Sequence, residues 1–190
     1  DIKDMTVEDV TQKITKRLYY NAYEDQRQKM IPHPSKELTH GLENVLYVCP
    51  NCQSFHTLET KGNHITCTSC QTKGIMDDYG FIHGFTYDNL IDWNIYQKTL
   101  KKELRASTFS STARLNLIDE DNQKLTELGQ ITITYKDESF IIEGDYQITI
   151  SIHEISNPTI TFRRDFGFVY QDEHYLIMLD RYTAAFLRVA

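Results

Sequence analysis

The four cysteines stand in two short pairs, and this pattern constrains the fold more than any other feature of the chain. Cys49 and Cys52 form the first pair, Cys67 and Cys70 form the second, and fourteen residues separate them. A two-residue spacing lets one backbone turn direct two thiolates at the same metal ion, and two such turns complete a tetrahedral site. The spacing therefore predicts a zinc ribbon over residues 45–84.

The residues between the two pairs agree with a ribbon. The stretch "SFHTLETKGNHITCT" reads as a strand, a turn around Gly62 and a second strand, so the hairpin returns the chain beside its start. Four thiolates satisfy one zinc ion, and we expect His56 and His64 at the surface instead of among the ligands. Such a closed site has no position for a substrate, so the expected role of the metal is structural.

Other uses of the cysteines remain as alternatives. A redox pair lies at the end of a strand and opens a helix, but no helical pattern follows either pair here. Disulfides would require export, and the sequence shows no signal peptide. Iron also binds four thiolates, although a site without a redox context favours Zn²⁺.

Charge argues against a nucleic-acid module. The formal net charge is −7, and Lys61 and Lys73 are the only Lys or Arg residues within 49–84. A nucleic-acid surface gains most of its affinity from such residues, which neutralise phosphates. Nucleic acid is thus an improbable partner, and a stand-alone ribbon protein that binds nucleic acid or another protein is the second hypothesis.

Residues 1–44 are expected to hold a helix over residues 6–30 and then a linker. Thr6 is a candidate N-cap, and apolar residues recur after it at helical spacing. Pro32 and Pro34 end the pattern, because two prolines so close together cannot lie inside a helix. We expect this helix to bury one apolar stripe by docking on a domain outside the chain.

Residues 85–105 are expected to form a linking helix. Leu90, Trp93, Leu100 and Leu104 fall on one stripe, and cations gather at the carboxyl end, where they suit the helix dipole.

Residues 106–190 change to alternating apolar and polar side chains, which is typical of strands. The seven candidate strands are "ARLNLID", "GQITITYKD", "SFIIEG", "YQITISIHEI", "PTITFRRD", "FGFVYQD" and "HYLIML". The closing "DRYTAAFLRVA" loses the alternation and can begin a helix. Seven strands and a terminal helix predict an antiparallel barrel or sandwich like a pleckstrin-homology or GRAM domain. The predicted class of the whole chain is α+β.

The β domain is expected to act through protein contacts. It carries 13 acidic side chains against seven basic ones, which would repel the anionic inner leaflet of a membrane. Arg163 and Arg164 share one turn and could meet a phosphate, but a solvated turn is the simpler interpretation. We expect contacts with the chain's own enzyme or with a second copy, as in a homo-oligomer, and no direct binding to lipid.

Several stretches resemble the C-terminal extension that follows the catalytic domain in some bacterial 1-acyl-sn-glycerol-3-phosphate acyltransferases. They lie between residues 6 and 104, and they are "ITKRLYYNAYEDQRQ", "LTHGLENVLYVCPNC", "KGNHITCTSC", "DDYGF" and "IDWNIYQKTLKKEL". The resemblance implies a parent enzyme that moves an acyl chain from a carrier thioester to a lysophospholipid at the inner membrane face. It also implies that the four cysteines are metal ligands. Because the sequence has no signal peptide and no apolar run of about 18 to 20 residues, we expect the chain to be cytoplasmic.

The catalytic domain of that family would precede Asp1, in line with a chain that begins without an initiator Met. His83 and Asp88, in "HGFTYD", have the His-x4-Asp spacing of glycerolipid acyltransferases but follow the cysteine site and lack the family's flanking residues. No catalytic residue is therefore assigned, and we expect the chain itself to be non-catalytic.

Overall fold

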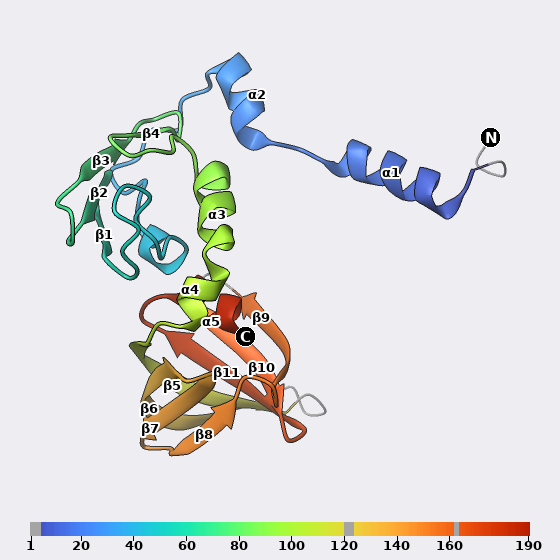
Figure 1. Cartoon of the computed structure of the whole chain (residues 1–190), viewed down its shortest axis with the longest axis vertical. Coiled ribbons are helices and arrows are strands. Elements are labelled where there is room, and N and C mark those ends of the chain that lie inside the picture. The colour runs from blue at the N-terminus through green and yellow to red at the C-terminus, as the bar shows by residue number, and fades with distance from the viewer. Residues whose placement is uncertain (1–4, 120–123, 162–163) are drawn as a thin grey trace. The chain divides into compact units, whose positions relative to one another are not determined.

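The computed structural model describes residues 5–119, 124–161 and 164–190. The chain is α+β and divides into two compact units, Asp1–His33 and Pro34–Ala190. Figure 1 shows the order of the elements along the chain.

The first unit contains α1 (Val7–Leu18) and α2 (Ala22–Lys29). Thr6 begins α1 with a capping box, as expected, because its hydroxyl accepts the N–H of Asp9 and its own N–H donates to the Asp9 carboxylate, each at 3.1 Å. The single helix predicted over residues 6–30 is thus two helices.

The break between the helices has a local cause. Tyr19 ends α1 in an extended conformation, and the side chain of Asn21 accepts the N–H groups of Tyr23 and Glu24 to begin α2. No residue of either helix is buried, and the structure describes every residue of both. Within the described residues of the first unit, nothing buries the apolar stripe of α1.

The second unit begins with a small antiparallel sheet. Its strands pair in the order β1 (Leu58–Lys61), β2 (His64–Cys67), β3 (Lys73–Met76) and β4 (Ile82–His83). Gly62, with φ of +62°, lies in the turn between β1 and β2, where the sequence predicted it. A short 3-10 helix, η2 (Leu42–Asn44), precedes the sheet.

A helical segment follows the small sheet and completes its core. The linking helix predicted over 85–105 is divided at Leu100 into α3 (Leu90–Thr99) and α4 (Lys101–Arg105). Trp93 of α3 is fully buried in one cluster with side chains of the small sheet. The core of the small sheet comprises Leu46, Cys49, Leu58, Ile65, Cys67, Met76, Ile82 and Trp93.

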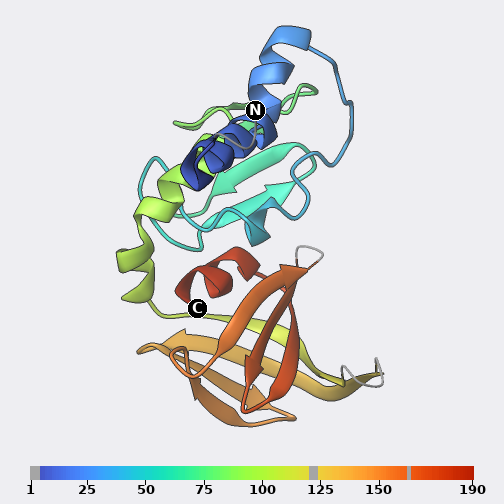
Figure 2. The same ribbon diagram turned by 90° about the vertical axis from the view of Figure 1, so that its right-hand side faces the viewer.

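The rest of the second unit is a seven-stranded antiparallel sheet that curls into a half-barrel (Figures 1 and 2). The strands are β5 (Phe109–Asp119), β6 (Lys124–Lys136), β7 (Ser139–Gly144), β8 (Ile148–Ser151), β9 (Ser156–Thr161), β10 (Asp165–Tyr170) and β11 (Glu173–Leu179). Their order in the sheet is β8-β7-β6-β5-β11-β10-β9, so the first strand pairs with the last.

The short helix α5 (Thr183–Val189) packs into the half-barrel, as Figure 2 shows. The fully buried ring of Phe186 lies 4.8 Å from that of Phe109 and 5.8 Å from that of Phe140, measured between centroids. Aromatic rings from strands and helix thus form one core.

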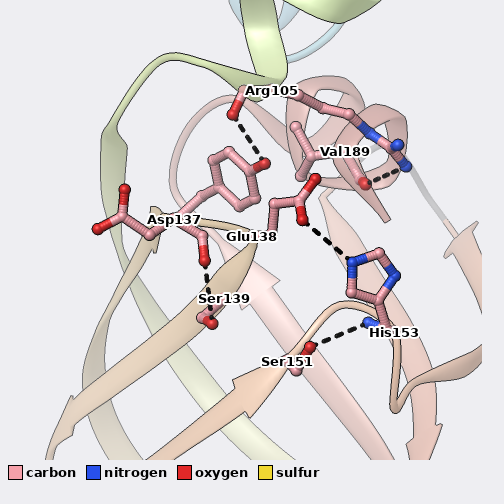
Figure 3. Close-up of polar contacts among 8 residues, drawn as sticks. Arg105, Asp137, Glu138, Ser139, Ser151, His153 and Val189 are labelled. Carbon is pink, nitrogen blue, oxygen red and sulfur yellow. Dashed lines mark hydrogen bonds and ion pairs between the residues drawn. The ribbon is translucent and has the colours of Figure 1, made fainter.

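The two sheets of the second unit are joined by shared packing. Tyr47 and Val48 precede the first cysteine pair but belong to the core cluster of the seven-stranded sheet. Arg105, the last residue of α4, donates from its guanidinium to the carbonyl of Val189 at 3.1 Å (Figure 3). Its own carbonyl accepts the hydroxyl of Tyr135 at 3.0 Å.

Candidate metal centre

The structure brings all four cysteines together. Cys49 and Cys52 lie in the loop between Val48 and Phe55, Cys67 ends β2, and Cys70 lies in the loop before β3. Their four sulfur atoms all lie within 4.8 Å of one another.

Each pair is held by the same backbone turn. The N–H of Cys49 donates to the carbonyl of Ser54 at 3.0 Å, and the N–H of Gln53 donates back to the carbonyl of Cys49 at 2.9 Å. Gln53 has a φ of +61°, a left-handed conformation that tightens the turn. Two main-chain hydrogen bonds thus close the first turn.

The second turn repeats the first. The N–H of Cys67 donates to the carbonyl of Thr72, and the N–H of Gln71 donates to the carbonyl of Cys67, both at 2.9 Å. Gln71 has a φ of +62°. The two turns, each bearing two thiols, face each other across the site.

The sulfur spacing fits a tetrahedral metal. A metal–sulfur bond of about 2.3 Å gives a tetrahedron with edges of about 3.8 Å. The Sγ atoms of Cys49 and Cys70 are 3.8 Å apart, and so are those of Cys52 and Cys67. A disulfide would need about 2.05 Å, and all four cysteines are free. These residues could hold one metal ion between the two turns.

The four thiols are not equivalent. Burial raises the pKa of Cys49 to about 12, although the N–H groups of Cys52 and Asn51 donate to its sulfur and oppose that rise. The Ser54 hydroxyl beside Cys52 lowers the pKa of that thiol to about 6. A metal bound here would deprotonate all four thiols, whatever their separate environments.

Helix α3 holds the segment that leads into the first turn. The indole N–H of Trp93 donates to the carbonyl of Val48 at 2.9 Å. The fully buried amide of Gln97 accepts the N–H of Tyr47 at 3.2 Å and donates to the carbonyl of Val45 at 2.9 Å. Sequence reasoning found Trp93 through its place on an apolar stripe but gave no sign of Gln97.

His64 is exposed, as predicted, whereas His56 is only partly at the surface, because the residue is half-buried. The ring of His56 lies between Phe109 and Tyr182, with centroid distances of 4.5 and 4.4 Å. Both ring nitrogens are buried and have no hydrogen-bond partner among the described residues. Burial lowers the pKa of His56 to about 4. The ring is therefore a neutral aromatic group that packs between the loop of the small sheet and the half-barrel.

The structure gives His83 a different partner from the one the spacing suggested. Its Nε2 lies 2.7 Å from a carboxylate oxygen of Asp77. The carbonyl of Asp88 accepts the N–H of Ile82 at 2.7 Å, so this residue supports the backbone of the same loop. The His83–Asp77 pair is largely exposed, and it is an ordinary ion pair at a turn of the small sheet.

A second histidine lies beside a serine and an acid, as in a hydrolase triad. Figure 3 shows, however, that the hydroxyl of Ser151 accepts the backbone N–H of His153 at 3.3 Å. The ring Nε2 of His153 lies 3.1 Å from Glu138, and both of these side chains are more than half exposed. The ring is thus engaged with the acid and does not activate the hydroxyl.

The two arginines considered for phosphate binding are not both visible. Arg163 lies outside the described residues, and Arg164 lies 3.5 Å from the carboxylate of Asp180.

In the part of the chain that the structure describes, no helix is long and apolar enough to span a bilayer. Comparisons with protein-family models, with curated proteins and with solved structures found no match.

Proposed function

We propose that the chain is a non-catalytic accessory region built around a structural zinc site and that it works by binding protein partners. The observation that carries the proposal is the closed set of four sulfurs at tetrahedral spacing. Four thiolates fill the coordination sphere of Zn²⁺, and no position is left for a substrate or an activated water.

The half-barrel supports a binding role. The sheet has four strands followed by three, with the first strand beside the last, and a helix follows them. This order supports our proposal that the half-barrel is a pleckstrin-homology-like domain. The fold class alone does not set a function, and the acidic surface favours protein over anionic lipid.

Helix α1 offers a further contact surface. Val7, Ile14 and Leu18 lie on one stripe and are each at least half exposed. This stripe is suited to dock on a folded partner. On the sequence resemblance alone, we propose that the partner is the catalytic domain of a phospholipid-synthesis acyltransferase and that the chain works at the inner membrane face.

Elemental analysis tests the metal site. We expect one zinc per chain in native protein, and no more than traces in a Cys67→Ser variant. Native protein that holds no stoichiometric metal, or that has Cys49 bonded to Cys52 as a disulfide, would contradict the proposal.

An acyl-transfer assay tests the absence of catalysis. The purified chain, mixed with an acyl-carrier thioester and lysophosphatidate, should give no turnover above the buffer. Turnover that disappears in His83→Ala would show that the chain is an enzyme.

A further inference from the structure

Hydroxyl groups surround the cysteine cluster. Three of them lie within hydrogen-bond range of one sulfur each: Ser54 of Cys52 at 3.4 Å, Thr57 of Cys67 at 3.2 Å and Thr72 of Cys70 at 3.1 Å. All three hydroxyl-bearing residues are half-buried.

We propose that these three hydroxyl groups donate hydrogen bonds to the metal-bound thiolates and thereby set how tightly the site keeps its metal. The inference rests on the proposed function, since it assumes a metal between the two turns. It adds three positioning residues to a site that the sequence defines by cysteines alone.

The direction of these hydrogen bonds follows from the chemistry of coordination. A thiol must lose its proton to bind a metal, and a thiolate can only accept. The proton of each bond must then come from the hydroxyl. Donation to a charged acceptor is stronger than donation to a neutral one, so the thiolate is the preferred target. The Thr57 hydroxyl has two acceptors in range, the sulfur of Cys67 and the carbonyl of Ser54, which lies farther away at 3.4 Å. The preference for a charged acceptor selects the sulfur.

The hydroxyl of Ser54 also joins the two turns. It lies 3.0 Å from the hydroxyl of Ser69, which belongs to the second turn. When Ser54 donates to Cys52, its oxygen is free to accept from Ser69. Two successive hydrogen bonds then connect Ser69 in the second turn, through Ser54, to Cys52 in the first turn.

A purely local role explains these side chains less well. The carbonyls of Ser54 and Thr72 already close the two turns by accepting the N–H groups of Cys49 and Cys67. The turns therefore need no side chain at either position. Ser54 and Thr72 each follow their first cysteine by five residues, so the repeated turn places a hydroxyl at the same site twice.

The expected magnitude comes from other metal sites. Four thiolates around one divalent ion leave two negative charges, which donors in the surroundings stabilise. Losing a group that hydrogen-bonds a ligand typically weakens metal affinity by about 10-fold to 100-fold.

The experiment compares isosteric and hydroxyl-retaining variants of the whole chain. Thr57→Val and Thr72→Val remove the hydroxyl while keeping the shape, whereas Thr57→Ser and Thr72→Ser keep the donor. Thr68→Val is the matched control, because its hydroxyl lies 3.2 Å from the carbonyl of Thr57 and is not paired with a sulfur. Zinc affinity is measured by competition with a chromophoric chelator, and the absorption spectrum of the Co²⁺-substituted protein is recorded.

We expect each valine variant to bind zinc about 10-fold to 100-fold more weakly. With Co²⁺ in the site, the sulfur-to-metal charge-transfer band should move to longer wavelength, because an unbonded thiolate is a better electron donor. The serine variants and the control should match wild type in affinity and band position.

Two results would overturn the inference by itself. One is a valine variant with wild-type affinity and an unshifted cobalt band, and the other is a serine variant as impaired as its valine counterpart, which would indicate packing. A wild-type chain that holds no metal would overturn the inference and the proposed function together.

Discussion

The indole N–H of Trp93 donates to the carbonyl of Val48, which lies 2.9 Å away and one residue before Cys49, the first cysteine of the cluster. The bond joins α3 to the segment that carries Cys49, and the ring that makes it is fully buried. Buried carbonyls are costly to leave unpaired, so this contact fixes where the first turn begins. The position of the metal centre thus depends on a residue 41 positions after its second cysteine.

Trp93→Phe should destabilise the second unit. The variant leaves the Val48 carbonyl buried without a donor, which costs about 1–3 kcal/mol, and the smaller ring adds a cavity. Urea unfolding of zinc-loaded protein checks this. Ile95→Ala, on an exposed position of the same helix, is the control and should change the free energy of unfolding by less than about 0.5 kcal/mol. Equal midpoints for the two variants would contradict the role given to the indole.

Gln97→Met should open the segment before the first cysteine pair. Methionine has a similar size but cannot pair with the N–H of Tyr47 or the carbonyl of Val45, and each orphaned group costs about 1–3 kcal/mol. Hydrogen exchange should therefore accelerate at the Tyr47 amide more than at amides of β7. Unchanged protection at Tyr47 would show that water replaces the lost partner without cost.

His56 should make the second unit acid-sensitive. Its pKa in the folded chain is about 4, below the ordinary value of 6.5, so the unfolded chain binds a proton that the folded chain excludes. The stabilisation is therefore complete above pH 6.5 and is lost as the pH falls towards 4, by up to about 3 kcal/mol. The ring packs on Phe109 and on Tyr182, and the Tyr182 hydroxyl donates to the His56 carbonyl at 3.3 Å.

Unfolding free energies of wild type and His56→Phe between pH 7 and pH 4 measure this effect. The variant should lose less stability over that range than wild type, whereas a change at the exposed His64, such as His64→Gln, should leave the slope unaltered. A wild-type slope in His56→Phe would assign the acid sensitivity to other groups, the metal site among them.

Removing a bound metal should lower the stability of the half-barrel as well as that of the small sheet. Tyr47 and Val48 belong to the core of the seven-stranded sheet, and Val48 is bonded to the first ligand cysteine through the main chain. If metal loss costs this core about 2 kcal/mol, the unfolding temperature of a chain of this size falls by about 4–8 °C. Calorimetry with and without a chelator measures the shift, and the chelator should have no further effect on Cys67→Ser. An unshifted transition would show that the two sheets are energetically independent.

The chain should not sediment with anionic vesicles, even at low salt. The β region carries 13 acidic and seven basic side chains, and Arg164 already faces Asp180. Each basic residue near an anionic surface contributes only about 1 kcal/mol, so repulsion should prevail. Strong binding that disappears when Arg163 and Arg164 are both changed to Ala would reverse this expectation.

Local patterns allowed the sequence to predict much of the fold. Two residues between cysteines define a turn by themselves, and alternation with a period of two marks a strand without reference to the rest of the chain. The structure accordingly has seven strands and a terminal helix after residue 106, and it has the four cysteines in one cluster. The breaks in both long helices were missed, because a cap such as Asn21 competes with a helical pattern that continues through it.

Long-range contacts could not be predicted. The burial of His56 depends on Phe109 and Tyr182, which lie far along the chain and on different elements. Gln97 is polar, so nothing in a helical pattern marks it as buried. Both residues contribute to the junction between the metal centre and the half-barrel, where the fold of one element depends on another.

The four cysteines differ in solvent exposure, and this difference affects the rate of metal exchange. Cys49 and Cys67 are buried, whereas Cys52 is partly exposed and Cys70 is exposed. A competing ligand can reach the ion only from the side of the two exposed cysteines, and the bond to Cys70 is the first that it can displace. Exchange of a bound metal should therefore be associative, with a rate that rises with the concentration of a competing chelator.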